Sequence, residues 1–440
     1  MKTPIVDFVK GYIESDVSRL HMPGHKGRSY VGCEALDITE ISGADVLYFS
    51  EGIIKESEEN ASSLFGTART FYSTEGSSLV IKAMLALVAK KNGYILAARN
   101  VHKSFVYAAA LIDVDVKWIY PESFSSLCSC IVSAEDIREQ LTSVEQLPCA
   151  VYLTSPDYLG NMLDIRAIAS VCDEFGVPLL VDNAHGAYLA FCEQNLHPIS
   201  LGASMCCDSA HKTLPALTGG AYLHISKKAP TEYVEKASSK LALFASTSPS
   251  YLVLQSLDMC NKILSDNYFE EIKNCVSKIE KLKKELIKAG FNVNGNEPLK
   301  LSIDTRNFGY KGTEIACLLR EVGVELEYSD EDSIVAMITP DNRDDDIERL
   351  RVFLLGLSKK ESLAIDILTP SKPKKMISIR EAIFSDSEFI SVEEADGRIC
   401  ASPTVSCPPA VPVVISGEEI GEAEIEIFKK YRIERVEVVK

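Results

Sequence analysis

Lys212, a lysine in a turn of small residues, is the side chain of this sequence that points most clearly to a particular chemistry. It lies in the run Asp-Ser-Ala-His-Lys-Thr at 208–213, after a short apolar stretch. Upstream, Asp182 ends the apolar run Leu-Leu-Val-Asp and is followed by Asn-Ala-His-Gly. Pyridoxal phosphate chemistry requires an amine that forms a Schiff base and a carboxylate that keeps a pyridinium nitrogen protonated. Because a lone lysine is usually a solvated surface charge, this interpretation depends on the surrounding residues.

Two segments rich in hydroxyl groups precede predicted helices. The run Ser73–Ser78 holds Gly76, Ser77 and Ser78 directly before an expected helix, and a second run begins at Ser246. Free backbone N–H groups, hydroxyl donors and the helix dipole favour a phosphate group at such a position. Taken alone, each segment is better explained as a helix N-cap.

Three histidines and one serine lie at positions that suit the same ligand. His102 follows the expected strand Ile95–Ala98, at the edge of a parallel sheet where ligands bind, and its flat ring can stack on a planar cofactor. His185 follows the strand-end aspartate, which it can orient, or it can face the cofactor. Ser209 and His211 share the lysine turn and can donate to a phosphate group. A hydrogen-bonded surface histidine is the simpler explanation of His102 alone.

The apolar pattern predicts an α/β protein. Short apolar runs alternate with helical stretches over the first half of the chain, which predicts a mostly parallel sheet covered on both faces. A long helical stretch at 251–289 and a smaller α/β pattern follow. The expected strands are 94–98, 116–120, 150–154, 178–182, 220–225, 299–304 and 334–339; the expected helices include 79–91, 164–175, 313–322 and 345–357.

We predict four parts of the chain. These are an N-terminal arm at 1–50, a large cofactor-binding domain at 51–250, a small α/β domain at 251–365 and a C-terminal domain at 366–440.

Composition excludes several classes of protein. The formal net charge of −17 disfavours nucleic acid as a partner. No apolar run approaches the roughly 20 residues of a membrane helix, and the N-terminus lacks the apolar region of a signal peptide. We therefore expect a cytoplasmic protein without a membrane partner. The 13 cysteines include no Cys-x-x-Cys pair, so we predict no metal site.

Several motifs resemble the bacterial ornithine/lysine/arginine decarboxylase family in its short form, which belongs to fold type I of the pyridoxal phosphate enzymes. They are His-Met-Pro-Gly-His-Lys-Gly at 21–27, Asp-Ile-Thr-Glu at 37–40, Gly-Ile-Ile-Lys-Glu-Ser at 52–57, Ser-Pro-Asp-Tyr-Leu-Gly at 155–160, Ser-Thr-Ser-Pro-Ser-Tyr at 246–251 and Gly-Arg at 397–398. The resemblance covers nearly the whole chain. It implies an aspartate-aminotransferase-like large domain, a smaller α/β domain and a C-terminal decarboxylase domain.

The resemblance also implies a reaction and a site. The cofactor is pyridoxal 5'-phosphate, Lys212 forms the Schiff base, Asp182 holds the pyridinium nitrogen and His102 stacks on the ring. The other residues expected at the cofactor are Gly76, Ser77, Ser78, His185, Ser209, His211 and Ser246, the last from a neighbouring subunit. The expected reaction is α-decarboxylation of arginine, lysine or ornithine to a polyamine or its precursor and CO2, by a homodimer or larger assembly that shares its sites. Glu418 is a candidate partner for the distal cation of the substrate, although a solvated acid is the simpler explanation.

The chain departs from the family pattern at several positions. Asn183 stands where many short members have glutamate, and Glu75 stands where asparagine often precedes the glycine. Cys407, Ala410 and Ser416 replace a tyrosine, a glycine and a proline of the C-terminal motif. That region lies near the distal end of the substrate in the family, so the choice among the three basic amino acids stays open.

Two other classes of function remain. An aminotransferase of the same fold clamps the substrate carboxylate with an arginine of the small domain. The candidates Arg320, Arg343, Arg349 and Arg351 lie in charged, solvated sequence settings, which disfavours this class and, with it, an aldolase. The intact set of lysine, aspartate and histidine likewise disfavours a non-catalytic homologue.

Overall fold

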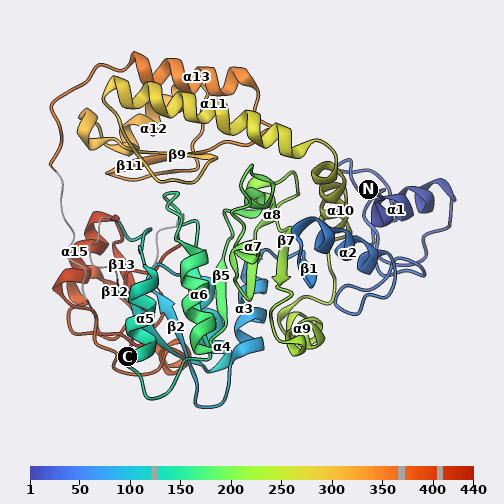
Figure 1. Cartoon of the computed structure of the whole chain (residues 1–440), viewed down its shortest axis with the longest axis horizontal. Coiled ribbons are helices and arrows are strands. Elements are labelled where there is room, and N and C mark those ends of the chain that lie inside the picture. The colour runs from blue at the N-terminus through green and yellow to red at the C-terminus, as the bar shows by residue number, and fades with distance from the viewer. Residues whose placement is uncertain (121–125, 365–371, 404–409) are drawn as a thin grey trace. The chain divides into compact units, whose positions relative to one another are not determined.

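The structure, a computed structural model, describes residues 1–120, 126–364, 372–403 and 410–440 (Figure 1). It divides into two compact units, of which unit 1 comprises residues 1–88 and 165–270 and unit 2 comprises residues 89–164 and 271–440. Each unit is built from two separate stretches of chain, so the units do not coincide with the four predicted parts. The predicted boundary at 365/366 lies outside the described residues, and the predicted domain bounds stay predictions.

The central sheet has seven strands in the order β1-β7-β6-β5-β4-β2-β3. Strand β7 pairs antiparallel with β1 and β6, whereas the pairs β5–β6, β2–β4 and β2–β3 are parallel. The sheet is therefore mostly parallel, as the alternation of apolar runs predicted. Unit 1 contributes β1 (Arg69–Ser73), β5 (Leu179–Asp182), β6 (Met205–Asp208) and β7 (Ala221–Ile225), and unit 2 contributes β2 (Tyr94–Ala98), β3 (Asp115–Ile119) and β4 (Ala150–Thr154).

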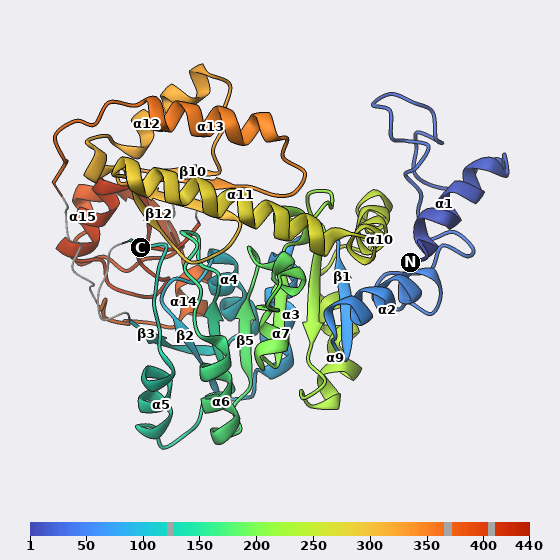
Figure 2. The same ribbon diagram turned by 45° about the horizontal axis from the view of Figure 1, so that its top comes forward.

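Helices surround the strands of unit 1. Helix α3 packs on α9 and on strands β6 and β7, and helices α1, α2 and α10 pack on one another (Figure 2). The segment between α1 and α2 forms neither helix nor strand. The helices of this unit are α1 (Pro4–Glu14), α2 (Ile53–Phe65), α3 (Ser77–Val88), α6 (Ile165–Phe175), α7 (Pro198–Leu201), α8 (Ala210–Thr213), α9 (Thr231–Phe244) and α10 (Tyr251–Ser265), with a 3₁₀ turn at Ala187–Phe191.

The single long helix predicted at 251–289 was wrong, because the structure has two. Helix α10 ends at Ser265 and α11 (Tyr268–Ala289) begins three residues later. Asp266 has φ −86° and ψ −96°, which is not helical, and the Ser265 hydroxyl donates to the Lys262 carbonyl at 2.8 Å. Short polar side chains such as these compete with the helix for its backbone hydrogen bonds.

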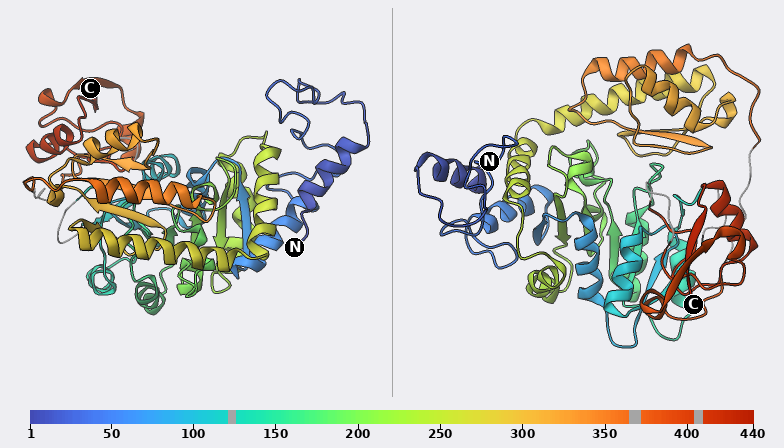
Figure 3. Two further views of the ribbon diagram at one scale, coloured as in Figure 1. Left: turned by 90° about the horizontal axis from the view of Figure 1, so that it is seen from above. Right: turned by 180° about the vertical axis from the view of Figure 1, so that it is seen from behind.

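The second part of unit 2 holds a four-stranded antiparallel sheet in the order β10-β11-β9-β8. Its strands are β8 (Asn292–Asn294), β9 (Lys300–Asp304), β10 (Tyr328–Ser329) and β11 (Ser333–Met337). Helices α11, α12 (Gly312–Glu321) and α13 (Asp344–Gly356) pack on this sheet around Leu286, Ile303, Leu319, Ile334 and Leu354 (Figure 3). The strands and helices predicted for this stretch are present.

The end of the chain forms a small layer of its own within unit 2. Strands β12 (Ser387–Ser391) and β13 (Arg435–Val439) pair antiparallel. Apolar side chains of β13 and of α15 (Glu422–Lys430) share a core that includes Ile420 and Phe428. The remaining helices of this unit are α4 (Lys103–Ile112), α5 (Ala134–Thr142) and α14 (Ile379–Phe384).

Among the described residues, no helix is both long and apolar enough to cross a membrane. The cysteines within the same ranges are free thiols, and most are buried.

Candidate active site

Three of the predicted residues meet at one edge of the unit 1 strands. Strands β5 and β6 are parallel, with Asp182 in register with Cys207, so Asp182 and the turn that carries Lys212 leave the sheet at the same edge. Carboxyl ends of parallel strands are where α/β proteins bind ligands. The Lys212 Nζ atom lies 3.0 Å from the Nε2 atom of His185. The side chain of Lys212 is half-buried, whereas Asp182 and His185 are buried.

The Asp182 carboxylate is held by short-range donors. Its Oδ1 atom accepts from the backbone N–H of Ala184 at 3.2 Å and from the Cys207 thiol at 3.4 Å. A buried carboxylate needs such donors to offset the loss of its hydration. Cys207 was not among the predicted site residues. Its place beside Asp182 follows from the register of β5 and β6, in which in-register side chains of parallel strands project from the same face, and sequence does not reveal that register.

The hydroxyl groups of two separate segments converge beside the lysine turn. Ser209 donates to the Oγ atom of Ser77 at 2.8 Å. Gly76, which precedes α3, has φ +71° and donates its N–H to the Gly219 carbonyl at 2.8 Å. A Cβ atom at Gly219 would lie 2.7 Å from the Thr74 carbonyl oxygen. The two loops approach this closely because Gly219 lacks a side chain.

His211 points its ring at the same glycine loop. Its Nδ1 atom lies 2.9 Å from the Gly220 carbonyl, so Nδ1 carries the proton and donates. Burial lowers the pKa of His211, and the neighbouring Lys212 charge lowers it further, although the bond to Gly220 opposes this. A neutral His211 therefore offers Nε2 as an acceptor. Its predicted donation to phosphate requires the charged ring, which a phosphate anion would favour.

Glu75 and Ser246 contact each other within the chain. The backbone N–H of Ser246 donates to Glu75 Oε1 at 2.8 Å, and the backbone N–H of Glu75 donates to the Ser73 hydroxyl at 3.1 Å. Glu75, which departs from the asparagine of the family pattern, thus fastens the Ser246 segment to the Ser73–Ser78 loop. The predicted contact of Ser246 with the cofactor of a neighbouring subunit stays a prediction.

His102 belongs to unit 2, where it caps helix α4. Its Nδ1 atom lies 3.1 Å from the backbone nitrogen and 2.9 Å from the hydroxyl oxygen of Ser104. These bonds fix the plane of the imidazole ring at the carboxyl end of β2. The role of His102 in stacking on a cofactor stays a prediction.

Glu418 is buried in unit 2, so its interpretation as a solvated acid was wrong. It is 3% exposed and accepts from Arg99 Nη2 at 3.0 Å and from the backbone N–H of Ile415 at 2.8 Å. Burial raises the pKa of Glu418, and the Arg99 charge partly offsets this. A carboxylate that is already neutralised has less to offer a substrate cation, and its substrate role stays a prediction.

The family departures near the C-terminus have different settings. Ala410 has φ +58°, a left-handed conformation that favours the glycine of the family motif, and its carbonyl accepts from the Lys103 N–H at 2.9 Å. Ser416 is buried, and its hydroxyl has no hydrogen-bond partner among the described residues. Cys407 lies outside the described residues.

The four arginines considered for an aminotransferase are engaged near their own helices. Arg320 pairs with Glu325, and Arg343 pairs with Asp346. Arg351 pairs with acids of α11 and α13, and Arg349 donates to a carbonyl oxygen. None of the four is buried.

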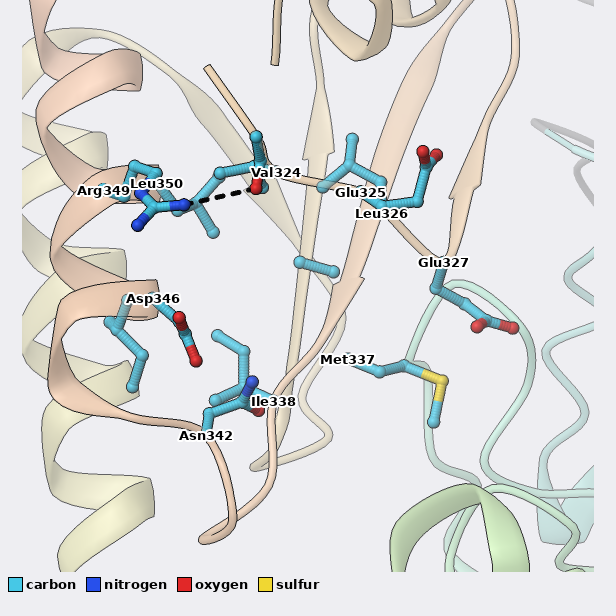
Figure 4. A pocket seen from close by; sticks show the side chains of 13 residues that line it. Val324, Glu325, Leu326, Glu327, Met337, Ile338, Asn342, Asp346, Arg349 and Leu350 are labelled. Carbon is cyan, nitrogen blue, oxygen red and sulfur yellow. Dashed lines mark hydrogen bonds between the residues drawn. The ribbon is translucent and has the colours of Figure 1, made fainter. Parts of the chain in front are cut away.

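A hollow on the small sheet of unit 2 lies outside the predicted set of residues. Its walls come from the segment 323–327, from the end of β11 and from α13 (Figure 4). Its acidic residues are engaged: Glu327 accepts from the Tyr158 hydroxyl at 2.6 Å, and Glu325 and Asp346 pair with arginines. Because no lysine and none of the residues predicted at the cofactor is among the described residues that line it, we assign it no role in the chemistry.

Two family models match the chain, one over its larger N-terminal part and one near its C-terminus. The family model described as Orn/Lys/Arg decarboxylase, major domain, matches residues 3–301, and that described as Orn/Lys/Arg decarboxylase, C-terminal domain, matches residues 368–433. The chain is 29% identical to a protein named arginine decarboxylase from Bacillus subtilis, over 97% of this chain and 93% of that one. It is 28% identical to a protein of the same name from Bacillus anthracis, over 98% and 93%.

Solved structures show the same fold. A lysine decarboxylase from Francisella novicida matches all of this chain and 81% of its own length, with a TM-score of 0.83 and 18% identity. A serine palmitoyltransferase from Sphingomonas wittichii matches 80% and 83%, with a TM-score of 0.58 and 13% identity. The lysine turn and the strand-end aspartate lie within the residues that the first family model matches, so the site and the comparisons point to the same family. The chain belongs to the Orn/Lys/Arg decarboxylase family of pyridoxal phosphate-dependent amino acid decarboxylases.

Proposed function

We propose that this protein decarboxylates a basic amino acid (arginine, lysine or ornithine) at Cα with pyridoxal 5'-phosphate, yielding CO2 and a polyamine or polyamine precursor. The observation that carries the proposal is the 3.0 Å contact between Lys212 Nζ and His185 Nε2, beside the Ser77–Ser209 pair. Relatives named arginine decarboxylase, which match nearly the whole chain, support a basic substrate.

The residues of unit 1 fit this cofactor. Hydroxyl groups of Ser77 and Ser209 lie together at the start of α3, where backbone N–H groups also favour a phosphate. The position of a Cβ atom at Gly76 has no neighbour within 4 Å, so this loop leaves space. Asp182 would hold the pyridine nitrogen, and Lys212 would carry the cofactor. When bound, pyridoxal phosphate supplies the electron sink for the electrons that remain after CO2 leaves.

His185 can accept a proton from Lys212. Because a protonated Lys212 has only donors, its Nζ donates to Nε2 of His185. Nε2 is therefore a base within reach of the Lys212 proton, which lets the amine become the reactive free base. The same contact orients the amine towards the turn of Asp182.

The contacts of the four arginines considered for an aminotransferase favour decarboxylation, in which the substrate loses its carboxylate, over transamination, in which it keeps it. An aminotransferase gains from a strong arginine clamp, because the carboxylate stays on the product. A decarboxylase loses by such a clamp, since tight binding of the ground-state carboxylate adds to the barrier for its departure. Arg320, Arg343 and Arg351 are paired with acids near their own helices.

We infer that the protein acts as a homodimer whose sites are shared. The segment between α1 and α2 exposes large apolar side chains, among them Leu20 at 94%, Val31 at 88% and Tyr30 at 70%. A group of neighbouring exposed apolar side chains marks a surface that contacts another molecule more often than a surface that stays in water. A second copy of this chain, which would bring Ser246 towards the neighbouring cofactor, is the occupant that the family resemblance supports. The cytoplasmic location stays a prediction.

The decisive experiment measures CO2 release from arginine, lysine and ornithine separately by the purified, cofactor-loaded protein. We expect release from one of them, and Lys212→Ala should abolish it. Lys262→Ala removes an exposed lysine of α10 and is the matched control, for which we expect full activity.

Two results would contradict the proposal. Absence of CO2 from all three substrates, with cofactor bound, would exclude a basic amino acid as substrate. Transfer of the amino group to a keto acid at a rate above CO2 release would instead support the aminotransferase alternative.

A further inference from the structure

A buried cluster of polar side chains lies at the end of β6, immediately before the lysine turn. Asp208 is fully buried, and its Oδ2 atom lies 3.0 Å from His197 Nε2 and 3.1 Å from His224 Nε2. Its Oδ1 atom accepts from the side-chain amide of Asn183 at 2.7 Å. His224 Nδ1 lies 2.8 Å from the Thr70 hydroxyl. None of these side chains has a place in the proposed chemistry.

Two chemical states can account for this arrangement. Ligand atoms of His197, Asp208 and His224 lie within 4.8 Å of one another, as metal ligands would. A metal on Nε2 would force the proton of His197 onto Nδ1, and that atom is buried without a hydrogen-bond partner among the described residues. Metal-bound histidines normally donate their second N–H to an acceptor, and a buried donor without one is costly. Without a metal, Nε2 donates to Asp208 and Nδ1 is a bare acceptor, so no N–H of His197 is left without a partner.

The cluster therefore holds an ionised carboxylate with three donors. Burial alone would raise the pKa of Asp208, but His197 and His224 more than offset this and keep its pKa below the ordinary value. Burial lowers the pKa of His224, which keeps that ring neutral at neutral pH. Asp208 is thus a fixed acceptor for all three side chains.

Asn183 connects this acceptor to the other half of the site. It follows Asp182 directly, its N–H donates to the Cys207 carbonyl at 3.0 Å, and its own carbonyl accepts from Gly186 at 2.8 Å. Asp208 in turn precedes Ser209, which bonds Ser77. The Asn183–Asp208 bond therefore ties the turn of Asp182 and His185 to the turn of Ser209 and Lys212.

We propose that Asp208 is a positioning residue: anchored by His197 and His224, it holds the lysine turn against the Asp182 turn through Asn183. This inference rests on the proposed function, because the two turns matter together only if they share a cofactor. A glutamate at 183 would put a second carboxylate against Asp208, so this chain's Asn183 and Asp208 suit each other.

The test compares cofactor binding in four proteins: wild type, Asp208→Asn, Asn183→Leu and the double variant. Each variant is expected to raise the pyridoxal phosphate dissociation constant of the apo-protein at least about tenfold, because a buried group loses its partner. The double variant should be no weaker than the worse single variant, because both act through one bond. The pH titration of the bound-cofactor absorbance should shift in the same variants.

Asp258→Asn is the matched control. Asp258 is a fully buried carboxylate of the same unit with three donors, but it binds Ile5, Val6 and Ser57 instead of the site turns. We expect it to lower thermal stability and leave the cofactor dissociation constant within about twofold of the wild-type value.

Three outcomes would overturn the inference. The first is cofactor binding by Asp208→Asn that matches that of Asp258→Asn. The second is full additivity of the two single effects. The third is one zinc or similar ion per chain in the purified wild type that Asp208→Asn loses. Failure of the proposed function is a distinct result, since the wild type would then bind the cofactor but release no CO2 from arginine, lysine or ornithine.

Discussion

Lys212 and His185 contact each other through two nitrogens, Nζ and Nε2, at 3.0 Å across two turns that follow adjacent strands. The contact joins the amine that we propose to carry the cofactor to a ring that can accept its proton. A second pair, Ser77 and Ser209, lies beside the same turn. The chemistry of unit 1 is thus concentrated in a few residues after β1, β5 and β6.

Replacing His185 by Phe should lower kcat about a hundredfold, since general-base assistance is worth at least that much. The aromatic ring keeps the bulk of the side chain and removes the acceptor for Lys212 Nζ. Steady-state CO2 release over a range of pH checks this. An unchanged kcat with the same pH profile would show that the proton of Lys212 has another destination.

Gly219→Ala should weaken the phosphate side of the site. Gly219 has φ +98°, and a Cβ atom there would lie 2.7 Å from the Thr74 carbonyl oxygen. We expect a loss of about 1–3 kcal/mol in stability and a higher cofactor dissociation constant. Gly176→Ala, at φ +65° with open space around the Cβ position, is the control for backbone strain alone. Equal effects of the two variants on cofactor binding would refute the close-approach argument.

Glu418→Gln tests whether this acid serves the fold or the substrate. Breaking its buried pair with Arg99 should cost about 3 kcal/mol of unfolding free energy and leave KM unchanged. Denaturant unfolding and steady-state kinetics on the same protein separate the two roles. A large rise in KM with normal stability would instead assign Glu418 to the distal cation of the substrate.

Glu58 should make the stability of unit 1 depend on pH. Burial raises the pKa of Glu58 to about 7 from 4.5, although Arg69, bonded at 2.7 Å, opposes the shift. Because the folded state holds this proton more tightly, its contribution to stability is full below pH 4.5 and is lost as pH rises through about 7. The difference is on the order of 3 kcal/mol.

The measurement is the free energy of unfolding of wild type and Glu58→Gln at pH 5 and pH 8. The wild type should lose stability over this range by more than the variant does. Identical pH dependence in both proteins would mean that Arg69 keeps Glu58 ionised throughout.

Much of the fold was predictable, because parallel strands buried on both faces read as short apolar runs. Strands β2, β4 and β5 and helices α3 and α6 fall within a few residues of their expected bounds. Strands β1 and β6 were not among the expected strands. In β1, Thr70 and Tyr72 are buried polar residues that bond partners inside unit 1, and such satisfied groups look like a loop in sequence.

Site residues could be predicted where neighbouring residues in the sequence determine their position. They could not be predicted where their position depends on contacts with residues far away in the sequence. Asp182 ends the predicted strand β5, and Ser209 and Lys212 were recognised from the residue types of their own turn. The burial of Glu418 depends on Arg99, 319 residues away, which no local pattern reveals. The roles of Asn183 and Asp208 likewise depend on strand register.

The division of each unit into two stretches of chain has a consequence for folding. Ser77 and Ser209 are 132 residues apart, and β1 must wait for β7 before it has a neighbour in the sheet. Closing a loop of that length costs entropy before any contact returns stability, and proteins rich in such distant contacts fold slowly. During synthesis, unit 1 is complete only after residue 270 has emerged. The first stretch of unit 2, residues 89–164, has been made by then, but its second stretch, residues 271–440, has not.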